Sequence, residues 1–123
     1  MKGYVVCVYK SIGDEKLLKK YAESPIPAIE KYEGKILVRG GKKLSIEGKE
    51  SPRTVVIEFP SFDAAKNYYY SKEYQKAHSF LEGTVVRDLQ IVEGPYYCIG
   101  SSSIDLHKYH VATEQYGLNL FFK

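Results

Sequence analysis

The feature that most constrains this 123-residue chain is the segment of residues 4–9, where every side chain is β-branched, aromatic or otherwise apolar. Such residues favour a β-strand. Successive side chains of a strand point to opposite faces of a sheet, so a strand with one face in water alternates apolar and polar residues. This segment does not alternate. The sheet that contains it must therefore be covered on both faces.

Capping residues and apolar spacing predict the other elements. Asp14, Ser61 and Ser71 are typical helix N-caps, and each precedes apolar side chains at helical spacing. A short helix is expected to open at Pro27 and to end at Gly34. The expected strands are residues 4–9, 35–39, 53–59 and 85–92. The order is β-α-β-β-α-β, which is the ferredoxin-like plan of an α+β sandwich.

Residues 1–95 supply no second helical layer for the far face of this sheet. The cover that best fits is the same sheet of a second copy, which gives an isologous dimer with a closed β core between the subunits. We therefore predict a ferredoxin-like domain over residues 1–95 that forms a two-fold dimeric α+β barrel. Residues 96–123 are expected to be a C-terminal extension that packs on the domain or on a partner subunit.

Composition narrows the class of protein. With 44% apolar and 27% charged residues the chain is globular, which excludes disorder and a disulfide scaffold. A net charge of +3 is too small for a dedicated phosphate-binding surface. No secretion signal is visible, and the apolar run at residues 4–9 is far shorter than the ~20 residues that cross a bilayer. We expect a cytoplasmic protein in which Cys7 and Cys98 are free thiols packed as small core residues.

The polar segment of residues 42–52, in which Leu44 and Ile46 alternate with polar residues, is expected to form a hairpin arm. Its positive charge comes from Lys42, Lys43, Lys49 and Arg53. Because Glu47 and Glu50 are interleaved with these cations, a solvated hairpin is favoured over a nucleic-acid site.

Arg39 ends a strand beside Gly40 and Gly41, whose missing side chains let a ligand approach closely. Its planar guanidinium suits a carboxylate, so it is either the anchor of an acidic ligand or the partner of Glu58 in an internal ion pair. Glu58 interrupts an apolar strand, where a carboxylate is either paired or has the raised pKa of a general base. We expect Arg39, Glu58 and His78 to surround one pocket, with Glu58 and His78 as the catalytic candidates.

Aromatic and titratable side chains on the second half of the domain are the other candidates. His78 lies on the apolar face of its predicted helix and is either an acid–base group near pH 7 or a packed core histidine. Tyr68, Tyr69 and Tyr74 either offer phenol donors to a ligand or serve as core aromatics. Asp88 faces either a pocket or a dimer salt bridge.

The extension contributes two further patterns. On a predicted helix, His107, His110 and Glu114 fall on one face and resemble a metal-ligand set, but a solvated face is favoured, so no metal site is predicted. Residues 118–122 are apolar and strand-like, and such an end is expected to dock on the domain or on a partner.

Several short motifs also resemble a known family. They are Arg39-Gly40-Gly41, Glu47-Gly48, the run from Val55 through Phe62, Ala65, Tyr69, the run from Ser71 through Gln75, Asp88-Leu89 and Val92-Glu93-Gly94. Together they resemble the family called domain of unknown function 1330, in the dimeric α+β barrel superfamily, over residues 1–95. The resemblance implies a ferredoxin-like subunit and a two-fold dimer. Relatives in the superfamily include cofactor-free monooxygenases, small-molecule isomerases and haem-handling proteins that use a pocket beside the sheet.

The chain departs from the family pattern at three positions. Tyr68 stands where the family commonly has Trp, Lys72 where it has Pro, and Leu81 where Arg is frequent. The uncharged Leu81 means that no anion-binding role carries over from that position. The extension of residues 96–123 is absent from most members.

Three hypotheses for function follow. The leading one is a homodimer that binds, and in one version transforms, a small polar or aromatic metabolite without a permanent cofactor, using Arg39, His78, Glu58 and the tyrosines. The second is a non-catalytic interaction module whose extension drives higher assembly. The third is haem or metal binding through His78 or the histidines of the extension.

Overall fold

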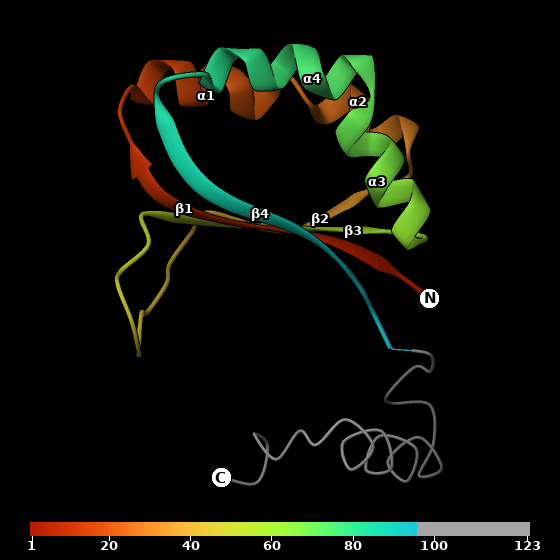
Figure 1. Cartoon of the computed structure of the whole chain (residues 1–123), viewed down its shortest axis with the longest axis horizontal. Helices are drawn as coiled ribbons and strands as arrows, with labels where there is room; N and C mark the ends of the chain where they lie inside the picture. The colour runs from red at the N-terminus through yellow and green to blue at the C-terminus, as the bar shows by residue number, and fades with distance from the viewer. Residues whose placement is uncertain (96–123) are drawn as a thin grey trace, which may run out of the picture.

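The computed structural model describes residues 1–95 (Figure 1). Its elements are, in chain order, β1 (Gly3–Ile12), α1 (Glu15–Glu23), α2 (Ile26–Lys31), β2 (Lys35–Arg39), β3 (Arg53–Phe59), α3 (Phe62–Tyr70), α4 (Lys72–His78), the 3-10 turn η1 (Ser79–Leu81) and β4 (Val85–Glu93). The strands form one antiparallel sheet in the order β2-β3-β1-β4. All the helices lie on one side of it, so the predicted ferredoxin-like plan is confirmed.

The predicted N-caps are confirmed, because each cap side chain accepts a hydrogen bond from a backbone amide in the first turn of its helix. The pairs are Asp14 with Lys16 (2.9 Å), Ser61 with Ala64 (3.0 Å) and Ser71 with Tyr74 (3.1 Å). The short helix begins one residue earlier than expected, with Pro27 in its first turn, and it ends at Lys31. Glu33 then takes a left-handed backbone conformation (φ 60°) before Gly34.

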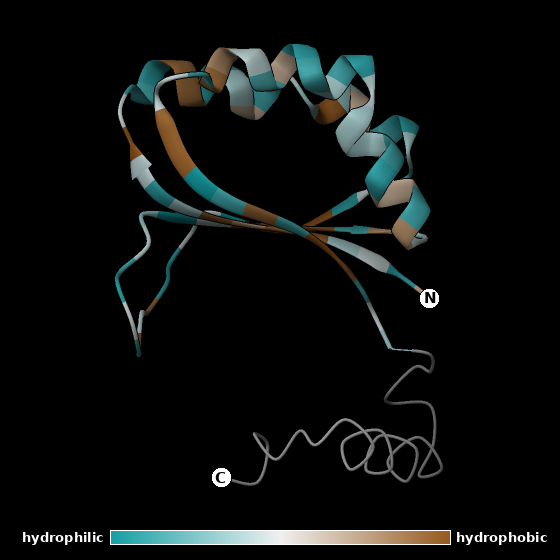
Figure 2. Ribbon diagram, in the orientation of Figure 1, coloured by the Kyte–Doolittle hydropathy of each residue, from teal (hydrophilic) through white to brown (hydrophobic). Residues whose placement is uncertain are grey.

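The core lies between the sheet and the helices. Alternate residues of β1 and β3 are buried on this side, and the helices cover them with small and aromatic side chains. The buried set is Val5, Cys7, Tyr9, Leu18, Ala28, Ile29, Ile57, Phe59, Ala65, Tyr68, Tyr74, Ala77 and Leu81. Cys7 is therefore a core residue, as predicted, whereas Cys98 lies outside the described residues. Figure 2 shows the hydrophobic segments of the strands beneath a helix layer that carries much hydrophilic colour.

The opposite face of the sheet has no helix over it within residues 1–95 (Figure 1). The residues on this bare face alternate with the core residues and include valines on all four strands, together with the charged residues Lys10, Glu58 and Asp88. Val6 is the Cα partner of both Val56 and Gln90, and Val8 and Val92 are 36% and 43% exposed. A face of this composition is typical of a buried interface rather than of a surface in water.

The segment between β2 and β3 differs from the expected hairpin arm. It contains no strand, and Leu44 and Ile46 are each 82% exposed. Gly41 and Gly48 take positive φ angles (87° and 79°), which turn the chain where the alternation predicted an extended arm. This loop projects from the sheet toward the side away from the helices (Figure 1).

Candidate functional site

A β-bulge in β2 decides where Arg39 lies. Ile36 is the Cα partner of Ile57 and Arg39 is the partner of Val55, with a register shift at the residues between them. Without the shift, Ile36 and Arg39 would point to opposite faces, because they are three positions apart. With it, both line the same cavity on the helix side of the sheet.

This central cavity has a volume of about 40 Å³ and lies between the sheet and helices α1, α2, α3 and α4. Its lining consists of Val5, Cys7, Tyr9, Tyr21, Ala22, Pro25, Ile29, Ile36, Arg39, Arg53, Val55, Ile57, Tyr68, Tyr74 and Leu89. Two arginines and four tyrosines are present, and no aspartate or glutamate. A space of ~10–15 Å³ holds one water molecule, so this one accommodates a few waters or a small head group.

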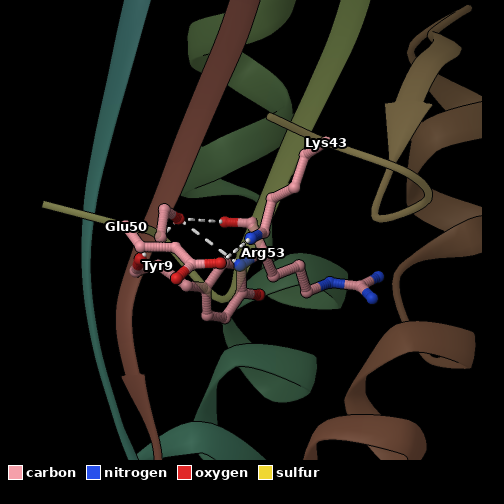
Figure 3. Close-up of polar contacts among 5 residues, drawn as sticks. Tyr9, Lys43, Glu50 and Arg53 are labelled. Carbon is pink, nitrogen blue, oxygen red and sulfur yellow. Dashed lines mark hydrogen bonds and ion pairs between the residues drawn. The ribbon is translucent and has the colours of Figure 1, made fainter. Parts of the chain in front are cut away.

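Arg53 is the less expected of the two arginines. It is the Cα partner of Tyr9, and its guanidinium carbon lies 6.0 Å from the centre of the Tyr9 ring. Its side chain extends away from the Lys43–Glu50 ion pair in the adjoining loop (Figure 3). The Nε atom is buried and has no hydrogen-bond partner within the described part of the chain. A buried donor without a partner is costly, so this atom calls for an acceptor.

The other arginine is anchored to a helix end. Nη2 of Arg39 donates a 2.7 Å hydrogen bond to the carbonyl of Ala22 in the last turn of α1. The carbonyls there carry the partial negative charge of the helix C-terminus, which favours a cation. The other donors of this guanidinium make no hydrogen bond to residues 1–95, and Arg39 itself is exposed.

Three of the tyrosines that line this cavity place their hydroxyl groups around the guanidinium of Arg87. Nη2 of Arg87 donates to Tyr74 Oη (2.8 Å), and Nη1 donates to Tyr9 Oη (3.2 Å) and to Tyr21 Oη (3.3 Å). The Oη atoms of Tyr21 and Tyr74 are 2.8 Å apart and share a hydrogen bond. Arg87 does not line the central cavity, so it acts on the cavity through these hydroxyls.

Burial sets the protonation of these groups. It raises the pKa of Tyr9, of Tyr68 and of Tyr74, with further upward contributions from Tyr21, so all three phenols are protonated donors at neutral pH. Burial also raises the pKa of the Cys7 thiol, which is therefore not a thiolate nucleophile.

Two grooves open beside the central cavity. The α1 groove, of about 360 Å³, is lined by Glu15, Leu18, Lys19, Ala22, Arg39 and Arg53, so it shares both arginines with the cavity. Glu15 lies seven residues before Ala22, roughly 10 Å along the helix axis, and forms no ion pair with either arginine. The β4 groove, of about 490 Å³, is lined by residues that include Tyr69, His78 and Arg87.

The structure brings together only some of the residues predicted from the sequence. Arg39, Tyr68 and Tyr74 line the central cavity. Tyr69 and His78 line the β4 groove instead. Burial and the nearby Arg87 charge lower the pKa of His78, so its ring is neutral at pH 7.

Glu58 lies on the other face of the sheet, and the prediction of one pocket holding Arg39, Glu58 and His78 is wrong. It alternates with Ile57 and Phe59, which face the helices, and it pairs with Lys2 Nζ at 3.4 Å. The alternative ion pair between Glu58 and Arg39 is excluded for the same reason. The two side chains start from neighbouring strands but point to opposite sides.

Asp88 also lies on the bare face, where it pairs with Lys10 Nζ at 3.3 Å. Its neighbour Arg87 was missed as a site residue, although the alternation of Val85, Arg87, Leu89 and Ile91 was a usable signal for one common face. Arg53 was interpreted as part of the basic loop, because the sequence does not show that its side chain turns under the helices.

Within residues 1–95, no group of three or more His, Cys, Asp or Glu side chains is arranged to hold a metal ion. The candidate ligands His107, His110 and Glu114 and the apolar residues 118–122 lie outside the described residues. No helix in the described part of the chain has the length and apolarity to span a membrane.

Comparison with solved structures supports the fold. A protein of unknown function from Rhodopseudomonas palustris is similar with a TM-score of 0.63 and 15% identity, over 78% of this chain and 84% of that one. A dimeric ferredoxin-like protein of unknown function from Bacteroides fragilis gives 0.54 and 17%, over 76% and 96%. A dimeric ferredoxin-like protein from Jannaschia gives 0.54 and 11%, over 76% and 100%. At these identities the likeness shows the fold alone.

No protein with a curated description matches the chain. A family model, described as domain of unknown function (DUF1330), matches residues 2–95, which is the whole of the described domain apart from its first residue. The chain belongs to the DUF1330 family.

Proposed function

We propose that this protein is a homodimer that binds a small organic anion in the central cavity of each subunit, without a permanent cofactor. The observation that carries the proposal is the charge imbalance of that cavity. Arg39 and Arg53 line it and no carboxylate does. The ion pairs within residues 1–95 join Lys2 to Glu58, Lys10 to Asp88, Lys31 to Glu73 and Lys43 to Glu50, and none includes an arginine.

Arg53 is half-buried, and a half-buried arginine is normally paired with a carboxylate, a phosphate or another acceptor. Here a carboxylate of a ligand fills that role, because the guanidinium fork binds two carboxylate oxygens at once. The size of the cavity supports a small head group inside it, with any larger part of the ligand in the adjoining α1 groove.

The bare face of the sheet supports the dimer. Valines on β1, β2, β3 and β4 give it an apolar surface that the described helices leave open, and a second copy matches that surface by symmetry. The loop between β2 and β3 projects toward the same side (Figure 1), and its exposed Leu44 and Ile46 offer apolar surface to a partner. Two of the structurally similar proteins are described as dimeric.

Isothermal titration calorimetry tests the binding proposal. The full chain is titrated with acetate, pyruvate, benzoate and phenylpyruvate, and with the neutral amide of each acid. At least one acid is expected to bind more tightly than its amide, and Arg39→Ala is expected to weaken that acid by about 1.5 to 3 kcal/mol, the usual contribution of a charged hydrogen bond.

The dimer is the internal control of this experiment, because the Arg39 side chain lies on the helix side of the sheet and not on the bare face. Arg39→Ala should leave the oligomeric mass unchanged. If no acid binds more tightly than its amide, anion binding is refuted. If Arg39→Ala dissociates the dimer, the side chain is structural rather than a ligand anchor.

A further inference from the structure

The hydrogen-bond donors and acceptors at the central cavity restrict the chemistry of a ligand more narrowly than the charge of the cavity does. Tyr9, Tyr21 and Tyr74 bring three O–H protons to it, and Arg87 occupies one acceptor position on each oxygen. The bond between Tyr21 and Tyr74 uses one of the three protons. The other two protons have no acceptor among residues 1–95.

Tyr68 adds to this surplus of donors. It is 1% exposed, it lines the cavity, and its hydroxyl makes no hydrogen bond to any other described residue. No Asp or Glu lines the cavity, and the backbone carbonyl of Ala22, a lining residue, already accepts a hydrogen bond from Arg39. The cavity thus offers hydrogen-bond donors both from its arginines, which form a charged side, and from its tyrosine hydroxyls, which form a phenol side.

The two sides differ in what they offer. Arg53 retains a buried Nε–H without a partner in the described part of the chain, so its side of the cavity lacks an acceptor, and a carboxylate is the acceptor that pairs most strongly with a guanidinium. The guanidinium of Arg87 is already occupied by three phenol oxygens and by Cys7 Sγ at 3.6 Å, so it reaches a ligand only through the phenol hydroxyls. Hydroxyl donors suit an uncharged acceptor such as a carbonyl oxygen.

The Tyr9 ring joins these two sides. The guanidinium carbon of Arg53 lies 6.0 Å from the ring centre and that of Arg87 lies 5.5 Å from it. The three residues are neighbours across the sheet, because Tyr9 is the Cα partner of both arginines. A ligand of a few atoms in this cavity would therefore meet a charged anchor and phenol donors at the same time.

We infer that the ligand is an oxo acid, with its carboxylate between Arg39 and Arg53 and its carbonyl oxygen on the phenol hydroxyls of Tyr9 and Tyr68. This inference rests on the proposed anion binding and names its substrate class. A hydroxy acid brings a proton into a cavity that has few free acceptors, and an amino acid brings a second cation beside two arginines. Both are disfavoured relative to the oxo acid.

Competition among matched acids tests the inference. The full chain is titrated calorimetrically with pyruvate, lactate and alanine, and with phenylpyruvate, phenyllactate and phenylalanine. In at least one series the oxo acid is expected to bind about tenfold more tightly than the hydroxy acid, with the amino acid weakest.

The variants assign the two ends of the ligand. Tyr9→Phe and Tyr68→Phe keep the rings and should lower oxo-acid affinity several-fold while changing hydroxy-acid affinity little. Arg53→Lys keeps the charge but loses the fork, and should weaken oxo and hydroxy acids alike. Tyr70→Phe, at an exposed residue outside the cavity, is the matched control and should change neither affinity.

The outcomes separate this inference from the proposed function. Equal binding of oxo and hydroxy acids, or equal loss of both in Tyr9→Phe and Tyr68→Phe, overturns the oxo-acid assignment and leaves anion binding in place. Absence of binding by every acid refutes both. Circular dichroism on each variant shows whether a lost affinity reflects a lost fold, and the phenylalanine variants, which remove only a hydroxyl, carry the decision if Arg53→Lys does not fold.

Discussion

The two faces of one sheet are built from alternate residues of the same strands, yet they differ in kind. On the helix side, Arg53, Tyr9 and Arg87 form a row across three strands, and Arg53 and Tyr9 line a cavity that no carboxylate lines. On the bare side, the acids Glu58 and Asp88 are each paired with a lysine among exposed or half-buried valines.

This difference between the two faces shows that the positions of the charged residues, rather than the net charge of the chain, distinguish a candidate ligand site from a candidate interface. On the bare face the described acids have their own cations, so that face is balanced and its apolar residues suit a second copy. On the helix face the arginines have no carboxylate partner within the described domain, and we propose that a ligand supplies it. The following substitutions act on one face and leave the other intact.

The largest effect is expected from a charge placed on the bare face. Val6→Asp puts a carboxylate where the partner sheet would pack, at a desolvation cost on the order of 3 kcal/mol or more. The variant should dissociate from twice the chain mass of 14.0 kDa to the monomer in analytical ultracentrifugation at micromolar concentration. Val6→Thr, which is similar in shape and uncharged, should remain a dimer.

A monomeric wild-type protein under the same conditions would refute the dimer outright. If Val6→Asp stays dimeric with an unchanged circular dichroism spectrum, the contact between subunits lies elsewhere.

Two adjacent glycines allow the position of Arg53 on the helix face to be tested with a matched control. Gly40 has φ 68°, and a Cβ atom there would lie 3.0 Å from Arg53 Nη1. Gly41 has φ 87° and nothing within 4 Å of such an atom. Replacing either by Ala costs about 1 to 2 kcal/mol of stability, because Ala resists a positive φ, but only at Gly40 does the new methyl group crowd the Arg53 guanidinium, which must shift by a few tenths of an ångström.

Urea unfolding and acid titration measure the two effects separately. Both variants should lose similar stability, and Gly40→Ala alone should bind acids more weakly. Equal acid affinity in the two variants would mean that the position of Arg53 does not matter for binding.

The smallest effect concerns His78, which faces Tyr69, Tyr74, Arg87 and Glu82 near the β4 groove. Burial first, and the Arg87 charge second, lower its pKa below the usual 6.5 in the folded state. The unfolded chain therefore binds this proton more tightly than the folded one. The stability that neutral His78 contributes is present above pH 6.5 and is lost as the pH falls through the folded-state pKa.

His78→Asn removes this titration. Urea unfolding between pH 8 and pH 5 should show that the wild type loses more stability on acidification than the variant does. Parallel curves for the two proteins would show that His78 titrates alike in the folded and unfolded states.

Much of the fold could be predicted from the sequence, because its signals are local. The apolar segment of residues 4–9 and the caps Asp14, Ser61 and Ser71 are each determined by neighbours in the chain. The site could be predicted only in part. The glycines beside Arg39 marked it, whereas the face to which it points depends on the bulge in β2, which is a property of strand pairing.

Arg53 shows the same limit more clearly. In the sequence it follows Lys42, Lys43 and Lys49 and reads as one more surface cation. Only the register of β3 against β1, which sets it opposite Tyr9, turns its side chain under the helices and away from those lysines. The residues near Arg53 in the sequence do not indicate this strand register, because it depends on pairing with a distant segment of the chain.

A crystal structure of the full chain grown with pyruvate tests the central claim most directly. We expect a carboxylate within hydrogen-bond distance of Arg53 Nε and of the Arg39 guanidinium, inside the cavity that the tyrosines line. Aspartate or glutamate side chains of the protein bound to both arginines, with no ligand between them, would contradict it.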